Sequence, residues 1–285
     1  SNIFNILFIL GLSALITPLT VAQQLVRLDV PLMIAISIVM LLLALDGRVG
    51  RLDGLLLFGG LIIYITFVVR QSLRESAEVK ELYNQEFGQG QSPRRMPGWV
   101  INAGLVLVGL GMLLAGSHWL VNASINVAQA FGISELVIGL TIIAAGTSLP
   151  EVATSIIASV KGERDIAVGN VIGSCIFNIL AILGLTSLFS GDGVAVAPAA
   201  LRFDIPIMIA SSAACLPIFF TGYRIGRREG LLFFVMYISY MLYLIMDASG
   251  HDALPAYSTA MGMFVLPLIA VTLGVLYVRA LRNGK

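Results

Sequence analysis

One segment of the chain places a carboxylate among hydroxyl groups, far from any other charge. Glu151 lies inside a long run of uncharged residues. An ionisable side chain in such an apolar run is costly to bury and indicates a functional site. Pro150 has no backbone N–H, and its ring opposes the carbonyl four residues earlier. We therefore expect a broken helix in which the Gly146 carbonyl is free to bind a ligand.

Two hydroxyl residues, Thr147 and Ser148, come just before Glu151. If the segment is helical, residues three and four positions apart share a face. The carboxylate, the two hydroxyls and the Gly146 carbonyl would then form a cluster of hard oxygen atoms. Such ligands suit Ca²⁺ and, by extension, Na⁺. Thr147, Ser148, Glu151 and the Gly146 carbonyl are the predicted ion ligands of this segment.

The next apolar segment supplies a second polar surface. Asn170, Ser174 and Asn178 recur at helical spacing and form a stripe on an otherwise apolar helix. The two asparagines have an alternative role as hydrogen-bonding contacts between helices. Gly169 and Gly173 form a small-residue pair that predicts close helix approach.

The composition identifies lipid as the solvent of this protein. Hydrophobic residues make up 58% of the chain and charged residues only 12%, and the mean hydropathy is +0.95. A soluble domain carries about twice that charged fraction. Cys175 and Cys215 lie in apolar runs and are interpreted as small buried residues. The net charge of +1 gives no case for nucleic-acid binding.

Nine candidate spans follow from the apolar runs: 1–22, 29–45, 54–70, 98–130, 133–160, 165–190, 203–222, 230–247 and 257–280.

These spans predict an orientation in the membrane. They place fourteen of the seventeen Lys and Arg residues on one side. Because cytoplasmic loops are enriched in Lys and Arg, that side is expected to face the cytoplasm. It would hold the polar segment 71–97, interpreted as a linker, and the C-terminus. We expect an integral protein of a prokaryotic plasma (inner) membrane.

An internal repeat organises the chain. Residues 1–15 nearly repeat as residues 174–188, and similar motifs follow in the same order in both halves. Asp29 and Asp204 occupy matching positions before a proline and are interpreted as helix starts. Residues 98–173 have no counterpart ahead of Ser1, so we expect about 75 residues and two spans upstream of this sequence.

The repeat also predicts the architecture. The copy at 98–247 has five spans, and two consecutive copies with an odd number of spans must have opposite orientations. We expect an all-α, five-plus-five inverted-repeat membrane protein whose first two spans are missing. Its parts would be 1–70 (three spans of the first half), the linker 71–97, the second half 98–247, and an extra C-terminal span in 248–285.

The motifs resemble the alpha-repeats of the calcium/cation antiporter superfamily, especially the prokaryotic sodium/calcium exchangers. The residues of the second repeat that carry the resemblance are Gly146-Thr-Ser-Leu-Pro-Glu151, Gly169-Asn-Val-Ile-Gly-Ser174 and Phe177-Asn178. Residues 1–5 resemble the end of the first repeat. The resemblance implies that Thr147, Ser148, Glu151, Ser174 and Asn178, together with Ser1 and Asn5, line one ion site. Some members carry Asp at the position of Asn178, which leaves the coupling ion open.

The resemblance implies antiport of Na⁺ and Ca²⁺ by alternating access, with the helix 98–130 sliding past the core. Exchange that uses H⁺, or that also needs K⁺, is an alternative within the superfamily, and a passive cation channel is an alternative of another class. An enzyme is not expected, because Glu151 has no nucleophile, second acid or histidine nearby in the sequence. No cofactor is expected, and the sequence leaves the oligomeric state open. Because half of the site would lie upstream, we expect the 285-residue chain alone not to transport ions.

Overall fold

The protein is a bundle of apolar helices. The computed structural model describes residues 1–87, 98–132, 138, 141–142, 144–267, 269–270, 274 and 278. Six helices in this part of the chain are long and apolar enough to cross a membrane: Leu25–Leu43, Arg51–Leu73, Val100–Ala130, Arg164–Phe189, Ala200–Phe220 and Arg227–Ser249. They confirm six of the predicted spans. Helices suit a bilayer because each satisfies its own backbone hydrogen bonds.

The other three predicted spans have different outcomes. The first is a shorter apolar helix, Phe4–Ile16. The fifth and the ninth (133–160 and 257–280) lie partly outside the described residues. The described residues of the fifth include two helical pieces, α6 (Ala144–Gly146) and α7 (Leu149–Lys161), with a turn between them.

Similar elements recur in the same order in both halves. The first half contains η1 (Phe4–Leu10), α1 (Gly11–Ile16), β1 (Leu19–Thr20), η2 (Leu25–Asp29), α2 (Val30–Leu43), β2 (Arg48–Val49) and α3 (Arg51–Phe87). The second half contains α4 (Gly98–Ala130), α6, α7, α8 (Arg164–Phe177), η4 (Asn178–Leu183), α9 (Gly184–Phe189), β3 (Val194–Ala195), η5 (Ala200–Asp204), α10 (Ile205–Phe220), β4 (Arg224–Ile225) and α11 (Arg227–Ser249). The π-helical turns η1 and η2 match η4 and η5. Such turns are rare and often occur at functional sites.

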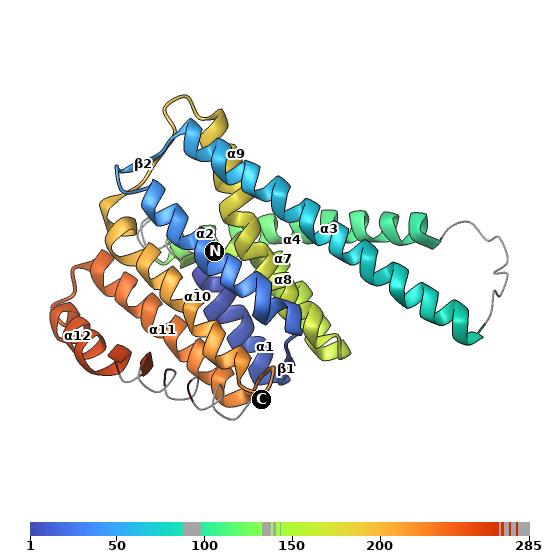
Figure 1. The fold of residues 1–285 in the computed structure, drawn as a ribbon. Coiled ribbons are helices and arrows are strands. Elements are labelled where there is room, and N and C mark those ends of the chain that lie inside the picture. Colours follow the sequence, from blue (N-terminus) through green and yellow to red (C-terminus); the bar gives the residue numbers. More distant parts are fainter. Residues whose placement is uncertain are drawn as a thin grey trace.

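The strand pairs reveal how the two halves are related. β1 pairs with β4, and β2 pairs with β3, both antiparallel. By the repeat, β1 corresponds to β3 and β2 to β4. The two pairs are therefore exchanged by one twofold operation. β1 and β2 lie at opposite ends of the bundle (Figure 1). The halves thus have opposite orientations, which confirms the predicted inverted repeat.

Close glycine contacts are also related by the twofold symmetry between the two halves. A Cβ added to Gly11 would lie 3.0 Å from the carbonyl oxygen of Gly230, and one added to Gly54 would lie 2.7 Å from that of Gly184. These two helix crossings, α1 with α11 and α3 with α9, depend on the absence of a side chain. The close approach predicted for Gly169 and Gly173 is not found in the described part of the chain, where an added Cβ at either would meet no atom within 4 Å.

Two tyrosine–aspartate contacts also form a symmetric pair. The Tyr64 hydroxyl donates to Asp29 over 3.0 Å, and the Tyr240 hydroxyl donates to Asp204 over 2.8 Å. As predicted, both aspartates stand directly before a helix, α2 or α10, but neither side chain makes a capping hydrogen bond. Each ends a π-helical turn that continues directly into the next helix. The tyrosines keep these carboxylates hydrogen-bonded inside apolar helices.

The predicted linker is partly helical. α3 continues to Phe87, so residues 71–87 extend a membrane helix rather than separate from it. The rest of the predicted linker, 88–97, lies outside the described residues. α3 and α4 project together from one side of the bundle (Figure 1).

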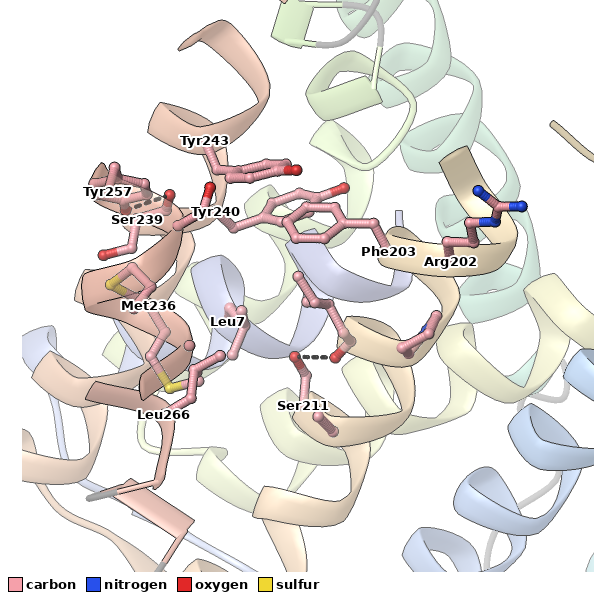
Figure 2. A pocket seen from close by; sticks show the side chains of 16 residues that line it. Leu7, Arg202, Phe203, Ser211, Met236, Ser239, Tyr240, Tyr243, Tyr257 and Leu266 are labelled. Atoms are coloured by element: carbon pink, nitrogen blue, oxygen red, sulfur yellow. Dashed lines mark hydrogen bonds between the residues drawn. The ribbon is translucent and has the colours of Figure 1, made fainter. Parts of the chain in front are cut away.

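A C-terminal segment follows the second half. It contains α12 (Leu254–Ala260) and η6 (Met261–Val265). The Tyr257 hydroxyl donates to the carbonyl of Ser239 over 2.8 Å, which fastens α12 to α11. The segment, α10 and α11 border a cavity (Figure 2).

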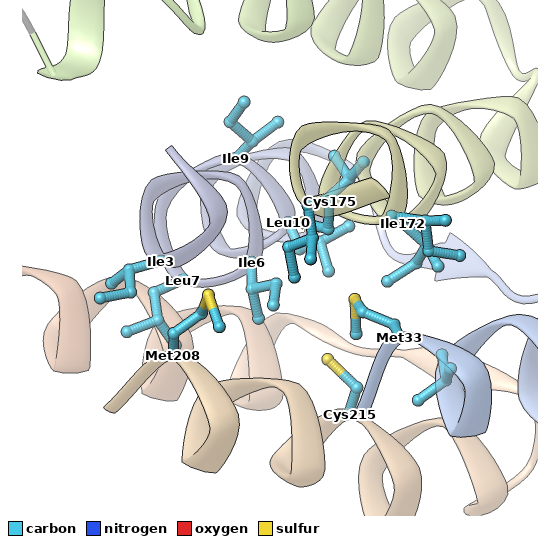
Figure 3. Packing of buried hydrophobic residues seen from close by; sticks show 14 of the residues in the cluster. Ile3, Ile6, Leu7, Ile9, Leu10, Met33, Ile172, Cys175, Met208 and Cys215 are labelled. Atoms are coloured by element: carbon cyan, nitrogen blue, oxygen red, sulfur yellow. The ribbon is translucent and has the colours of Figure 1, made fainter. Parts of the chain in front are cut away.

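The hydrophobic core lies where the two halves meet. Side chains from η1, α8, α2 and α10 pack together there, among them Ile6, Leu10, Met33, Ile172 and Cys215 (Figure 3). Both cysteines are buried and free, as the sequence predicted. This core packs against η1 and η4, whose first residues lie near the candidate site.

Candidate ion-binding site

The helix that carries Glu151 is broken just before it. α6 ends at Gly146, Thr147 and Ser148 form a turn, and α7 begins at Leu149. Pro150 occupies the first turn of α7, where a missing N–H costs no hydrogen bond. The predicted break is present, but the expectation of one helical face shared by Thr147, Ser148 and Glu151 is wrong. Glu151 lies instead in the first turn of α7, where the helix dipole favours a negative charge.

The Gly146 carbonyl is not free. It accepts a hydrogen bond of 2.7 Å from the Ser117 hydroxyl of α4. Gly146 is buried, and a Cβ added to it would collide with Val121, also on α4. The carbonyl is therefore not vacant as predicted: it accepts one hydrogen bond, which attaches α4 to the broken helix.

Glu151 itself is half-buried and incompletely paired. Its Oε2 atom is buried and has no hydrogen-bond partner among the described residues. A buried carboxylate oxygen without a donor is costly unless a cation compensates it. In the described part of the chain, no three His, Cys, Asp or Glu side chains gather to hold a metal ion. Among the described residues, an ion at Glu151 would therefore take its remaining ligands from neutral oxygens.

Asn170 connects α8 to α7 rather than facing an ion. Its amide donates to the Thr154 hydroxyl over 2.9 Å and to the Ser155 hydroxyl over 3.0 Å, with a longer contact of 3.5 Å to the Glu151 carbonyl. Of the two roles left open for this asparagine, the structure shows the contact between helices. These hydrogen bonds fix the first turns of α7, and with them the backbone of Glu151.

The other two members of the stripe behave differently. Ser174 is half-buried, and its hydroxyl makes no hydrogen bond with another described residue. The Asn178 amide donates to the side-chain oxygen of Asn2 over 3.0 Å. Asn2 in turn donates to the Cys175 carbonyl over 3.1 Å. Asn2 was not predicted; the repeat could have indicated it, because Asn2 and Cys175 occupy matching positions.

Residues from the first half reach the same region. The hydroxyls of Ser1 and Thr147 lie 3.1 Å apart, although 146 positions separate them in the chain. Asn5 is completely buried, and neither polar atom of its side chain has a hydrogen-bond partner among the described residues. Ser148 is also buried. The structure thus places Ser1 against the broken helix and leaves the Asn5 amide and the Glu151 carboxylate incompletely satisfied.

A carboxylate at a helix break, where two inverted copies meet within membrane-spanning helices, defines an ion transporter of the inverted-repeat class. Comparisons with known proteins specify the family. The sodium/calcium exchanger protein family model matches residues 1–70 and 101–246. The match leaves out residues 71–100 and the C-terminal segment.

Two curated relatives and a solved structure agree with this match. The chain is 40% identical over 246 residues to the putative antiporter CaxA of Alkalimonas amylolytica, covering 86% of this chain and 76% of CaxA. It is 38% identical over 215 residues to the inner membrane protein YrbG of Escherichia coli, covering 74% and 64%. It also matches the sodium-calcium exchanger NCX_Mj, solved after soaking with Na⁺ and Ca²⁺, with a TM-score of 0.66 and 29% identity over 87% of this chain and 73% of that one. The chain belongs to the sodium/calcium exchanger family, whose members are antiporters and not enzymes.

Proposed function

We propose that this chain forms the greater part of an antiporter that exchanges Na⁺ for Ca²⁺ across a prokaryotic plasma membrane. The observation that carries the proposal is the buried Glu151 Oε2 atom, which lacks a donor at the start of α7. A desolvated metal ion would supply the missing positive charge. Oxygen ligands of this kind suit Ca²⁺, and Na⁺ by extension.

The remaining ligands would come from both halves. Thr147 and Ser1 present adjacent hydroxyls, and Ser174 presents a hydroxyl with no described partner. Asn5 offers a buried amide oxygen. Asn178 and Ser148 complete the proposed set; Asn178 would exchange its contact with Asn2 for the ion. The Gly146 carbonyl already accepts the Ser117 hydrogen bond, so it would join this set only through its second lone pair.

The charge of the site provides a reason for exchange. By the repeat, the first half would supply a matching acid, so the complete site would hold two carboxylates. Two negative charges balance either one Ca²⁺ or two Na⁺. The two ions would then compete for the same ligands, and neither would need to be bound together with the other. Competition of this kind is what antiport requires.

Alternating access would move α4 along the bundle. α4 meets the broken helix at Gly146, through the Ser117 hydrogen bond and the packing of Val121. Many of its apolar side chains are exposed, including Leu105, Leu107 and Met112. A helix held at few points can slide at low cost, and its contact at Gly146 would transmit that movement to the turn beside Glu151. The C-terminus and the region 71–97 would face the cytoplasm.

The test is Na⁺-driven ⁴⁵Ca²⁺ uptake into vesicles that carry the full-length gene product. Glu151→Gln keeps the size of the side chain but removes its charge, and we expect uptake to fall to background. Glu163→Gln is the matched control, because Glu163 is an exposed acid in the loop that follows α7. Unchanged uptake in Glu151→Gln would show that Glu151 is not a ligand of the transported ion.

The same vesicles separate the alternatives. Uptake that persists without Na⁺ and follows an imposed pH gradient would identify H⁺ as the coupling ion. A requirement for K⁺ would identify cotransport of that ion. Uptake that neither gradient drives, and that does not saturate with Ca²⁺, would indicate a channel.

A further inference from the structure

A cavity of about 540 Å³ lies between α10, α11 and the C-terminal segment (Figure 2). This volume is within the range of small-molecule sites. Two walls belong to helices that can span a membrane, and the third is formed by α12 and η6. The family model does not cover this third wall. None of the proposed ion ligands lines the cavity, so it is separate from the ion site and independent of the function proposed above.

The body of the cavity offers little to a polar solute. Most of its lining is apolar, and several of its polar side chains are already hydrogen-bonded within the protein. Ser211 donates to the Ile207 carbonyl, Tyr240 to Asp204, and Tyr257 to the Ser239 carbonyl. An occupant would therefore present mainly hydrocarbon to this lining, since most polar atoms buried there would lose their hydration without a new partner.

One end of the cavity carries a positive charge. Arg202 is exposed at this end, and its guanidinium points away from the aromatic cluster of Phe203, Tyr240 and Tyr243 (Figure 2). Arg202 makes no hydrogen bond or ion pair with another described residue. The nearest acid in sequence, Asp204, accepts the hydrogen bond of Tyr240 instead. A cation beside an apolar cavity is complementary to an amphiphile with an anionic head.

We propose that this cavity binds an anionic phospholipid, with an acyl chain in the apolar body and the phosphate at Arg202. The surrounding bilayer supplies such molecules directly, because the walls are membrane-spanning helices. An arginine guanidinium matches a phosphate group through paired hydrogen bonds. The bound chain fills the space between the core and the C-terminal segment, and so holds α12 against α11.

The first test is lipid binding to the full chain. Purified, delipidated protein is titrated with phosphatidylglycerol or phosphatidylcholine, and bound lipid is counted by native mass spectrometry. We expect a preference for phosphatidylglycerol that Arg202→Gln reduces about fivefold. Arg224→Gln is the charge control, because Arg224 is an exposed arginine that does not line the cavity. Equal binding of the two lipids by the parent protein would overturn the proposal.

The second variant tests the cavity itself. Ala210 lines it, so Ala210→Phe would fill part of the space and remove the bound lipid. Ala213→Phe places the same side chain on an exposed position of α10 outside the cavity. Binding that both variants retain would contradict the proposal.

A measurement on the unmodified chain keeps the proposal testable if a variant fails to fold. Phosphatidylglycerol with a photoactivatable acyl chain is cross-linked to the parent protein in nanodiscs, and the labelled peptides are mapped. We expect labels concentrated on cavity residues such as Pro206, Met236 and Met261. Labels spread evenly over the membrane-facing helices, α4 included, would show only contact with the annular lipid. That result would contradict a specific lipid site in the cavity.

Discussion

The Tyr240 hydroxyl donates a hydrogen bond of 2.8 Å to the Asp204 carboxylate, and Tyr64 and Asp29 repeat this contact at 3.0 Å in the other half. Each contact joins the last helix of a half to the helical segment before it. Asp29 is only 5% exposed. A carboxylate so deeply placed in an apolar helix needs the donor that the tyrosine provides.

Removing either hydroxyl should therefore destabilise the protein. Tyr64→Phe and Tyr240→Phe each leave a carboxylate oxygen without its donor, and we expect a loss of about 1–3 kcal/mol in unfolding free energy. Thermal unfolding in detergent measures the effect. Tyr223→Phe is the control, because the Tyr223 hydroxyl makes no hydrogen bond with another described residue. Melting temperatures equal to that of the parent in both variants would contradict the structural role of these pairs.

The close helix crossings at glycine lead to a second prediction. A methyl group at Gly184 would press on the backbone of Gly54 and Phe58, at 3.3 Å and 3.1 Å, and one at Gly54 would lie closer still to Gly184. We expect Gly54→Ala to cost about 1–3 kcal/mol through overpacking.

Gly169→Ala provides the contrast. An added methyl there meets open space, and alanine favours a helix over glycine by about 1 kcal/mol. We expect this variant to unfold at the parent's temperature or slightly above it. A Gly169 variant less stable than the Gly54 variant would reverse the assignment of the close contacts.

A third prediction separates a connecting residue from a ligand. Asn170→Ala removes the hydrogen bonds to Thr154 and Ser155, so both stability and ion uptake should fall. Ser174→Ala removes a hydroxyl with no described partner, so uptake should weaken at low Ca²⁺ while the melting temperature stays unchanged. Loss of stability in the Ser174 variant, with unaltered Ca²⁺ dependence, would show that the two roles were misassigned.

The sequence predicted the features that follow from periodicity and repetition. Apolar runs predicted the spans, because a bilayer requires long apolar helices. Matching motifs predicted the inverted halves, which the strand pairs β1–β4 and β2–β3 display. Pro150 predicted the helix break, because a missing N–H acts locally. Each of these conclusions depends on positions along a single helix or on comparison between the two halves.

Contacts between helices could not be predicted in the same way. The sequence pattern suggested close packing at Gly169, but the rotation of α8 turns that glycine toward open space. Ser117 satisfies the Gly146 carbonyl from another helix, 29 positions away. Asn2 meets Asn178 although 176 positions separate them in the chain. Such partners are set by how helices rotate and cross, which local spacing does not determine.

The central claim is that the Glu151 carboxylate binds the transported ion. Anomalous diffraction from crystals of the full-length gene product, soaked with Sr²⁺ as a substitute for Ca²⁺, tests it most directly. We predict an anomalous peak beside Glu151 at a coordination distance of about 2.3–2.6 Å, between Ser174 and the Thr147–Ser1 hydroxyls, and its loss when Na⁺ is raised. A well-ordered Glu151 with no peak beside it, or Sr²⁺ bound elsewhere in the membrane region, would contradict the account.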